Sequence, residues 1–281
     1  MNNSNVPHLF IYDEGTAQNK DYFTYGEMNI IEKSLKKTTI INEYDDFLLQ
    51  TEAVIQRLRP DKNGLIIYIH GYLGDNEFFM EKSGYVLHTQ IMGNATTRYG
   101  MALSLQWKTV IPYGGAYVKA LASGEKFAYR LQDIYQVLRK YHPAAPVSFI
   151  CHSMGNRVFQ SIYETWVQIE PELKLNKVLF MAADLENDIF ETAFKNIEKH
   201  TEDIIVYHKN QDVTLKIATS LNHYTRLGLT GPKIGTEPSN CTVRDASDID
   251  DDKSFAGTIT HHRYFYGSKT VRKEIVDWLK K

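Results

Sequence analysis

A serine stands between a predicted strand and a predicted helix near the middle of the chain, within the stretch Cys151–Gly155 (C-H-S-M-G). The apolar run 146–150 is typical of a buried strand, and 156–168 carries apolar side chains at helical spacing. Such a turn leaves the hydroxyl of Ser153 exposed at a sheet edge. Amides of the first helical turn lack intrahelical partners, so they form an anion site beside it. The pattern predicts a nucleophile elbow of the form G-x-S-x-G, in which Cys151 replaces the first glycine.

Short apolar runs alternate with helical patterns along the rest of the chain. Strands are predicted at 8–12, 28–31, 65–69, 102–107, 146–150, 177–182 and 203–207. Helices are predicted at 46–58, 124–141, 156–168, 188–199 and 271–280. This alternation predicts an α/β fold with a mainly parallel sheet flanked by helices on both faces. The looser segments 71–100, 109–123 and 228–257 predict loop insertions over the site. We expect one domain over residues 1–281, with two strands and a helix in 1–60.

Composition limits the classes of protein to which the chain can belong. With 281 residues and a net charge of −2, it has no basic excess for binding nucleic acid. It has no apolar run of about 18 residues, so no transmembrane segment is expected. The N-terminal residues lack the charged and apolar regions of a secretory signal. Two cysteines do not make a disulfide framework. We therefore expect a cytoplasmic protein.

Candidate partners of the serine follow later strands. A serine hydroxyl needs a base to remove its proton, and the base needs an acid to orient it. Asp212 follows the predicted strand 203–207, and His261 and His262 precede the last helix. Asp184, which follows the preceding strand, is the alternative acid, although it can equally cap the helix predicted after it. The order serine, acid, histidine is the one expected of an α/β-hydrolase.

The sequence also offers two amides for an oxyanion hole. His70-Gly71-Tyr72 follows the β-branched strand 65–69. In this architecture an amide just after that strand faces the amide of the residue after the nucleophile. Tyr72 and Met154 are then the two donors, and Gly71 permits the close approach of the two backbones.

Five segments together resemble the α/β-hydrolase superfamily, and more narrowly a mostly bacterial, serine-hydrolase-like family with an H-S-M-G elbow. These segments are 65–72, 151–155, 182–186, 207–215 and 262–265. The resemblance extends over roughly residues 60–280 and implies a Ser-Asp-His site with esterase-like or lipase-like chemistry. It favours His262 as the base, because 262–265 matches the H-x-Y-F pattern of that family. Ser153, Asp212 and His262 are accordingly the predicted catalytic residues, with Tyr72 and Met154 in the oxyanion hole.

No cofactor or metal is expected. The acidic segment 245–252 does not fit a calcium loop, because Lys253 and Ile259 occupy the places of its glycine and its final glutamate. Zinc-ligand spacings and phosphate-binding glycine loops are also missing. The sequence thus predicts a serine hydrolase that cleaves a carboxylic ester, either of a lipid or of a small acyl compound, through an acyl-enzyme. Two alternatives stay open, namely an acyltransferase with the same site and a non-catalytic binding module with the hydrolase fold.

Overall fold

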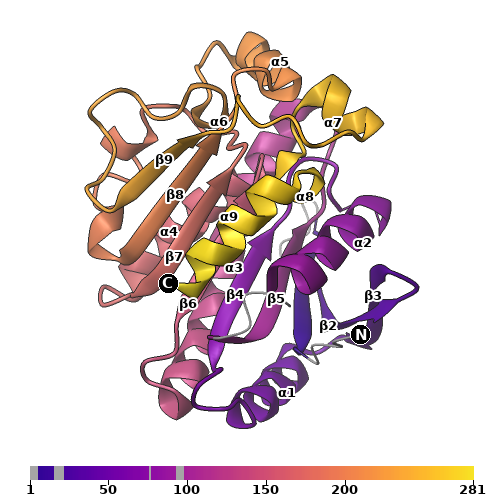
Figure 1. Ribbon diagram of the computed structural model, residues 1–281. Coiled ribbons are helices and arrows are strands. Elements are labelled where there is room, and N and C mark those ends of the chain that lie inside the picture. The colour runs from indigo at the N-terminus through magenta and orange to yellow at the C-terminus, as the bar shows by residue number, and fades with distance from the viewer. Residues whose placement is uncertain (1–5, 16–21, 76, 93–97) are drawn as a thin grey trace.

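A nine-stranded sheet crosses the computed structural model, which describes residues 6–15, 22–75, 77–92 and 98–281, with backbone only at 77–81 and 255–257. The strand order is β3-β2-β1-β5-β4-β6-β7-β8-β9 (Figure 1). The strands are β1 (His8–Asp13), β2 (Phe23–Ile31), β3 (Ser34–Ile41), β4 (Gly64–Ile69), β5 (Tyr99–Trp107), β6 (Val147–His152), β7 (Leu175–Met181), β8 (Thr201–His208) and β9 (Cys241–Asp245). In this order, each pair of neighbouring strands from β1 through β5 and β4 to β9 is parallel. β2 pairs antiparallel with β1, and β3 pairs antiparallel with β2 at the edge of the sheet.

Helices cover both faces of the sheet, so the predicted α/β-hydrolase architecture is confirmed (Figure 1). They are α1 (Tyr44–Gln56), α2 (Glu77–Val86), α3 (Tyr113–Tyr141), α4 (Gly155–Ile169), α5 (Val213–Asn222), α6 (Leu227–Thr230), α7 (Phe255–Thr260), α8 (Tyr264–Gly267) and α9 (Lys269–Lys280). A short π-helix, η1 (Leu87–Met92), continues α2. Helices α1, α3 and α4 contribute to one core, and α9 contributes to the core on the opposite face.

Strand β4 illustrates how the sequence builds two cores. All six of its residues are buried, because successive side chains point to opposite faces and both faces are covered. Ile67 and Ile69 pack in the core that includes α3 and α4, whereas Ile66 and Tyr68 pack in the core that includes α9. A continuous apolar run is therefore the expected signature of this strand, and it fixes the carboxyl end of β4 at the centre of the sheet.

Two helix predictions are wrong. Helix α3 begins at Tyr113, well before the predicted start at residue 124. Ala116 and Ala120 are buried against the sheet, so tertiary packing outweighs the low helix propensity of the glycines at the start of this helix. The segment 188–199 is not one helix but contains two short 3-10 helices, Ile189–Glu191 and Ile197–Lys199.

The two edge strands, β3 and β9, were not predicted from the sequence either. Each has a sheet neighbour on one side only, and most of its residues are exposed or half-buried. Neither strand therefore needs the apolar run on which the predictions depended.

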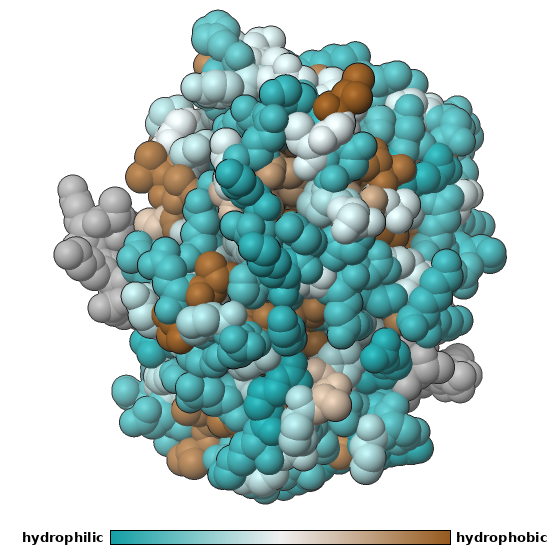
Figure 2. All heavy atoms as spheres, turned by 90° about the vertical axis from the view of Figure 1, so that its left-hand side faces the viewer, coloured by the Kyte–Doolittle hydropathy of each residue, from teal (hydrophilic) through white to brown (hydrophobic). Residues whose placement is uncertain are grey.

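On the side of the molecule that includes the β9 edge, hydrophobic residues are scattered in small groups among hydrophilic ones (Figure 2). Such scattering is ordinary for a protein surface. Within the described ranges, no helix is both long and apolar enough to span a bilayer.

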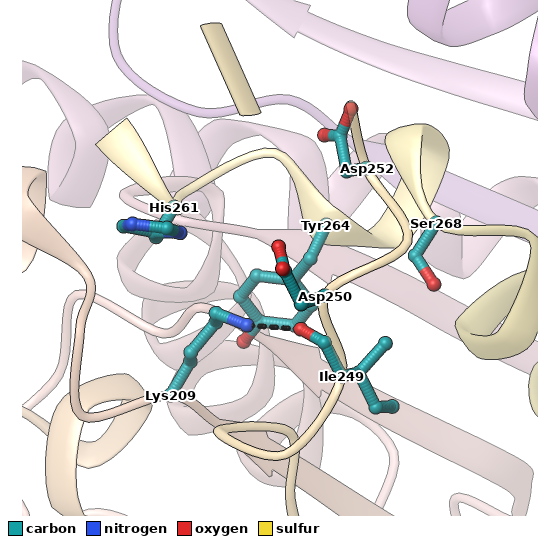
Figure 3. A pocket seen from close by; sticks show the side chains of 7 residues that line it. All are labelled: Lys209, Ile249, Asp250, Asp252, His261, Tyr264 and Ser268. Atoms are coloured by element: carbon teal, nitrogen blue, oxygen red, sulfur yellow. Dashed lines mark hydrogen bonds between the residues drawn. The ribbon is translucent and has the colours of Figure 1, made fainter. Parts of the chain in front are cut away.

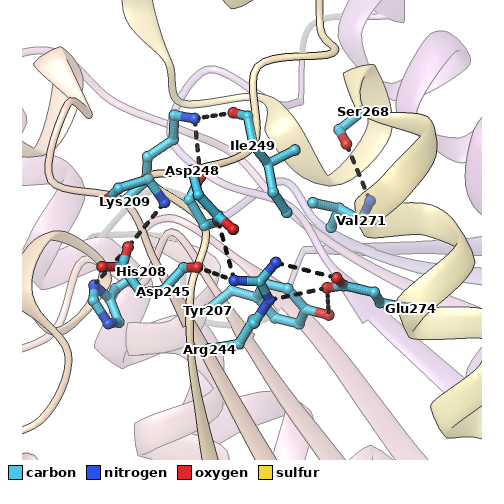
Figure 4. Close-up of polar contacts among 12 residues, drawn as sticks. Tyr207, His208, Lys209, Arg244, Asp245, Asp248, Ile249, Ser268, Val271 and Glu274 are labelled. Atoms are coloured by element: carbon cyan, nitrogen blue, oxygen red, sulfur yellow. Dashed lines mark hydrogen bonds and ion pairs between the residues drawn. The ribbon is translucent and has the colours of Figure 1, made fainter.

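Polar contacts tie β9 and β8 to α9 (Figure 4). Arg244 on β9 contacts Glu274 on α9 at 3.2 Å, and the hydroxyl of Tyr207 on β8 donates to Glu274 at 2.8 Å. Lys209 holds the loop after β9, because its Nζ donates to the carbonyl oxygens of Ala246 and Ile249. These contacts fix the chain between β8 and α9, the region from which two of the predicted site residues come.

Candidate active site

The chain turns from strand to helix at Ser153, as predicted. Ser153 follows β6, precedes α4 and has a φ of 54°, a left-handed conformation that costs a non-glycine residue about 1–2 kcal/mol. Its amide donates to the carbonyl of Met181 at 2.9 Å. Its carbonyl accepts from the amide of Asp184 at 3.2 Å and from the side chain of Asn156 at 2.7 Å. These bonds hold the strained turn in place.

Cys151 occupies the place of the first glycine in the elbow pattern. It lies on β6, is fully buried in the core that includes α3 and α4, and has no disulfide partner. Burial raises the pKa of its thiol well above the ordinary value, so the thiol is neutral. Cys151 therefore acts as a small core residue, which explains why this position accepts it.

Two glycines let the loop after β4 approach the elbow. A Cβ atom added to Gly71 would lie 2.6 Å from Ser153 Cβ, and one added to Gly155 would lie 2.5 Å from the carbonyl oxygen of His70. Both distances are shorter than a real Cβ contact permits. The backbone after β4 therefore passes directly over Ser153, as the predicted oxyanion hole requires.

His262 and Asp212 lie in direct contact. His262 Nδ1 donates to Asp212 Oδ2 at 2.7 Å, and the other oxygen of Asp212 accepts from the amide of Leu215 at 2.9 Å. The aspartate thus caps α5 while it binds the histidine. Asp212 is fully buried and His262 is 8 % exposed. With the proton on Nδ1, the lone pair of His262 is on Nε2.

Asp184, the alternative acid, has other partners. Its Oδ1 lies 3.2 Å from Arg226 Nε, and its Oδ2 accepts from the hydroxyl of Tyr113. The same cluster contains Glu186, which makes two hydrogen bonds with the fully buried Arg157, at 2.8 and 3.0 Å. The side chain of Asp184 therefore belongs to a buried ion cluster with Arg226, Glu186 and Arg157. Among the described residues, the one contact of Asp184 with Ser153 is made by its backbone amide.

His261, the alternative base, faces a different pocket. Its backbone is left-handed, with a φ of 51°, and its side chain lines a small pocket with Lys209 and Tyr264 (Figure 3). The acids Asp250 and Asp252 also line that pocket. Nowhere in the described part of the chain do three His, Cys, Asp or Glu side chains gather as metal ligands would.

Ser153 and His262 line one cavity of about 220 Å³. Its other described lining residues are Tyr68, His70, Gly71, Tyr72, Leu73, Gly74, Ser83, His152, Thr214, Thr260, Arg263 and Tyr266. They come from the carboxyl ends of β4 and β6 and the loops that follow them, from helices α2, α5, α7 and α8, and from the loop before α8. Four of the five predicted site residues thus either line this cavity or contact a residue that does. The fifth, Met154, follows Ser153 directly and is fully buried.

The amides of Tyr72 and Met154 donate no hydrogen bond to another described residue. Met154 is the N-cap residue of α4, where the helix dipole favours an anion. Tyr72 follows Gly71, whose carbonyl is fixed by His70 Nδ1 at 2.8 Å and by the Gly74 amide at 2.9 Å. Both amides are therefore unengaged among the described residues, and Tyr72 lines the cavity whereas Met154 is fully buried.

Two further histidines are neutral and structural. Burial lowers the pKa of His70 to about 4, and its Nε2 accepts from the Trp107 amide at 3.1 Å. Burial also lowers the pKa of His152 well below its ordinary value, and His262 lowers it further. His152 Nε2 donates to the backbone carbonyl of His262 at 3.1 Å. These histidines hold the loops that carry Gly71 and His262.

Two positioning residues were not predicted from the sequence. Asn156, in the first turn of α4, is fully buried and donates to the Ser153 carbonyl. Its only signal in the sequence was an amide side chain directly after the elbow motif. Tyr264 is buried and bridges two strand ends, because its hydroxyl accepts from the amide of Ala182 at 3.1 Å and donates to the carbonyl of Tyr207 at 3.2 Å. Tyr264 lies within the H-x-Y-F pattern, which gave its position but not this role.

A serine in a strained turn and a histidine bound to a carboxylate line one cavity, with one unengaged amide at Tyr72 in its lining and a second directly after the serine. These are elements of nucleophilic acyl chemistry. No curated protein matches the chain. Residues 49–277, which include every residue of this site, match the model of a family described as "Alpha/beta hydrolase of unknown function (DUF900)". The fold and the family model agree, and the chain belongs to this family of alpha/beta hydrolases.

Proposed function

We propose that the protein is a serine hydrolase that cleaves carboxylic esters through an acyl-enzyme. The observation that carries the proposal is the 2.7 Å contact of Asp212 with His262, which lines the same cavity as Ser153. A buried carboxylate beside Nδ1 fixes the tautomer that leaves Nε2 as a base, and it stabilises the imidazolium that forms. Ser153 is the nucleophile, His262 the base and Asp212 the orienting acid.

In the first half of the reaction, Ser153 Oγ forms a bond to the acyl carbon and its proton moves to His262 Nε2. The bond between the acyl carbon and the alcohol oxygen then breaks, and the alcohol leaves with that proton. In the second half, His262 takes a proton from water, the hydroxide attacks the acyl carbon, and the proton returns to Ser153 as the carboxylic acid leaves. All atoms come from the ester and one water molecule.

The negative charge of each tetrahedral intermediate lies on the former carbonyl oxygen. The amides of Tyr72 and Met154 are the donors proposed for it. They are preorganised by the glycine contacts at Gly71 and Gly155, so little reorganisation is needed during the reaction. One such donor typically lowers the barrier by about 3–4 kcal/mol.

A fluorophosphonate probe tests this proposal, because it phosphonylates a serine only when a base activates that serine. The folded protein should be labelled once, on the peptide that contains Ser153, and Ser153→Ala should not be labelled. Ser161→Ala is the matched control, because Ser161 lies on the same helix, α4, and donates to the carbonyl of Leu121 instead. Absence of labelling at Ser153 in the folded protein would defeat the proposal.

A further inference from the structure

The hydroxyl groups in the wall of the cavity at Ser153 bond one another. The side chain of Ser83 makes hydrogen bonds with both Tyr68 and Tyr266, and Tyr266 also bonds Arg263. With these hydroxyls engaged, the tyrosines offer mainly their rings to a ligand. No Asp or Glu belongs to the described lining, and apolar atoms make up most of its surface. The wall is therefore suited to a hydrocarbon group.

The cavity alone is too small for a long hydrocarbon chain. Its volume of about 220 Å³ lies below the roughly 300–1,000 Å³ of pockets that enclose drug-sized ligands. A short acyl group fits beside Ser153, whereas a longer chain has to leave the cavity. Outside the cavity, such a chain needs an apolar surface that shields it from water. A surface of this kind begins at helix α5.

Helix α5 continues the cavity wall as an exposed apolar face. Thr214 lines the cavity, and Ile217 and Leu221 follow it at positions i+3 and i+7, which place them on the same side of the helix. Ile217 is 57 % exposed and Leu221 is 58 % exposed. The polar residues Lys216 and Ser220 lie outside this face. Single exposed aliphatic residues are ordinary, but these two extend the wall of the candidate active site.

Two further exposed aliphatic side chains lie in the cavity lining or next to it in the chain. Leu73, in the loop after β4, lines the cavity and is 44 % exposed. Ile259 on α7 is 51 % exposed and precedes Thr260, which lines the cavity. Helices α5 and α7 contact each other and lie at the same end of the molecule (Figure 1). Exposed aliphatic side chains therefore come to this end from three separate segments of the chain.

We propose that the substrate is an ester with a hydrocarbon chain longer than the cavity encloses, and that this chain passes Thr214 and lies along Ile217 and Leu221. The inference rests on the proposed function and adds the class of substrate. From Thr214 to Leu221 the axis of α5 rises about 10 Å, at about 1.5 Å per residue, so the face offers contact well beyond the ester bond. Ile217 and Leu221 are specificity residues in this proposal, because they bind a part of the substrate that does not react.

Matched pairs of esters that differ only in chain length test the inference. In the first pair, para-nitrophenyl butyrate and para-nitrophenyl octanoate, the chain lies on the acyl part. In the second pair, butyl acetate and octyl acetate, it lies on the alcohol part. Each ester is used as a dissolved monomer, below the concentration at which it aggregates, so that only the protein can shelter the chain.

A methylene that contacts the protein on one side only should strengthen binding by about twofold, compared with about fourfold for a fully buried one. In at least one pair, the longer ester should therefore have a kcat/KM about 10-fold higher than the shorter one. The pair that responds tells which part of the substrate carries the chain. The double variant Ile217→Gln/Leu221→Gln removes both aliphatic side chains but keeps residues that favour a helix. It should reduce the ratio to about two or less, mainly through KM for the longer ester.

Leu49→Gln is the matched control, because Leu49 is a 65 % exposed leucine on another helix, α1, outside the described lining of the cavity. Its ratio should equal that of the unchanged protein. A ratio near one within both pairs, or a ratio that persists in the double variant, would overturn the inference. The proposed function would survive that result as long as Ser153→Ala abolishes hydrolysis of the short esters. If no ester of the four is cleaved in a way that depends on Ser153, both proposals fall together.

Discussion

Asp212 and His262 lie 50 residues apart in the chain and meet at 2.7 Å between Oδ2 and Nδ1. The aspartate cannot rotate away easily, because its other oxygen accepts the Leu215 amide at the start of α5. The position of the histidine is thus determined by a helix cap on the far side of the carboxylate. Asp184 has no comparable relationship with a histidine in the described residues, since Arg226 and Tyr113 hold its side chain.

Replacing Asp212 by Asn should separate catalysis from folding. The Asn side chain still caps α5, but it no longer stabilises Nδ1–H and the imidazolium. We expect kcat for para-nitrophenyl butyrate to fall by about 10³- to 10⁴-fold, while the melting temperature measured by circular dichroism changes by only a few degrees. Asp184→Asn serves as the comparison. If Asp184→Asn lost activity at an unchanged melting temperature while Asp212→Asn stayed active, the roles of the two acids would be reversed.

Gly71→Ala should impair activity through sterics alone. Its Cβ would meet Ser153 Cβ at 2.6 Å, so either the loop or the serine must shift. A displacement of this size at reacting groups costs on the order of 10²-fold in kcat/KM. Gly114→Ala is the matched control, because its added Cβ meets nothing within 4 Å and an alanine in α3 should raise stability by up to about 1 kcal/mol. Normal ester hydrolysis by Gly71→Ala would contradict the close approach of this loop to the serine.

Much of the fold was predictable because its central strands are buried on both faces. β4, β6, β7 and β8 are apolar runs, and the elbow motif fixed where β6 ends and α4 begins. The edge strand β9 was not predictable in the same way, since most of its residues remain half-buried or exposed. The segment 188–199 was wrongly predicted as one helix, because its apolar residues have helical spacing. Phe190 and Phe194 instead pack on Phe180 from a chain that contains only short 3-10 helices.

The location of the candidate site residues was predictable where chemistry and chain order coincide, whereas their catalytic roles stay predictions. The elbow and the order of acid and base pointed to residues that the structure brings to one cavity or to its wall. The sequence could not choose between His261 and His262 without a family pattern, because backbone direction decides which of two neighbours points inward. It also gave no sign that Arg157 and Arg226 would be fully buried, since arginine is ordinarily exposed.

The buried ion cluster that contains Asp184 should be important for stability. Arg226 is fully buried and contacts both Asp184 and Glu186. Arg226→Gln would remove the positive charge that balances these two carboxylates away from water. Loss of one partner of a buried ion pair typically lowers the free energy of unfolding by about 3–5 kcal/mol. Urea unfolding followed by tryptophan fluorescence measures the change. Lys253→Gln, which breaks the exposed pair with Asp250, should cost at most about 1 kcal/mol. Equal effects of the two substitutions would show that the buried cluster contributes no more than a surface pair.

Two buried histidines should make the protein less stable in acid. Burial, and then the neighbouring His88, lower the pKa of His8 to about 3, and burial lowers that of His70 to about 4, both from an ordinary value of 6.5. Below pH 6.5 the unfolded chain therefore binds protons at these positions that the folded protein does not bind. Their contribution to stability is complete above that pH and is lost as the pH falls toward the folded pKa values.

Between about pH 4 and pH 6.5, each of the two histidines should lower the free energy of unfolding by about 1.4 kcal/mol per pH unit of acidification. Urea titrations at several pH values measure this slope. His8→Gln keeps a polar side chain beside Ser104, to which His8 Nε2 is bonded at 2.8 Å, but it removes one titrating group. The slope of that variant should be shallower by the share of one histidine. An unchanged slope would mean that His8 is not the neutral, buried imidazole that its contacts with Ser104 and His88 imply.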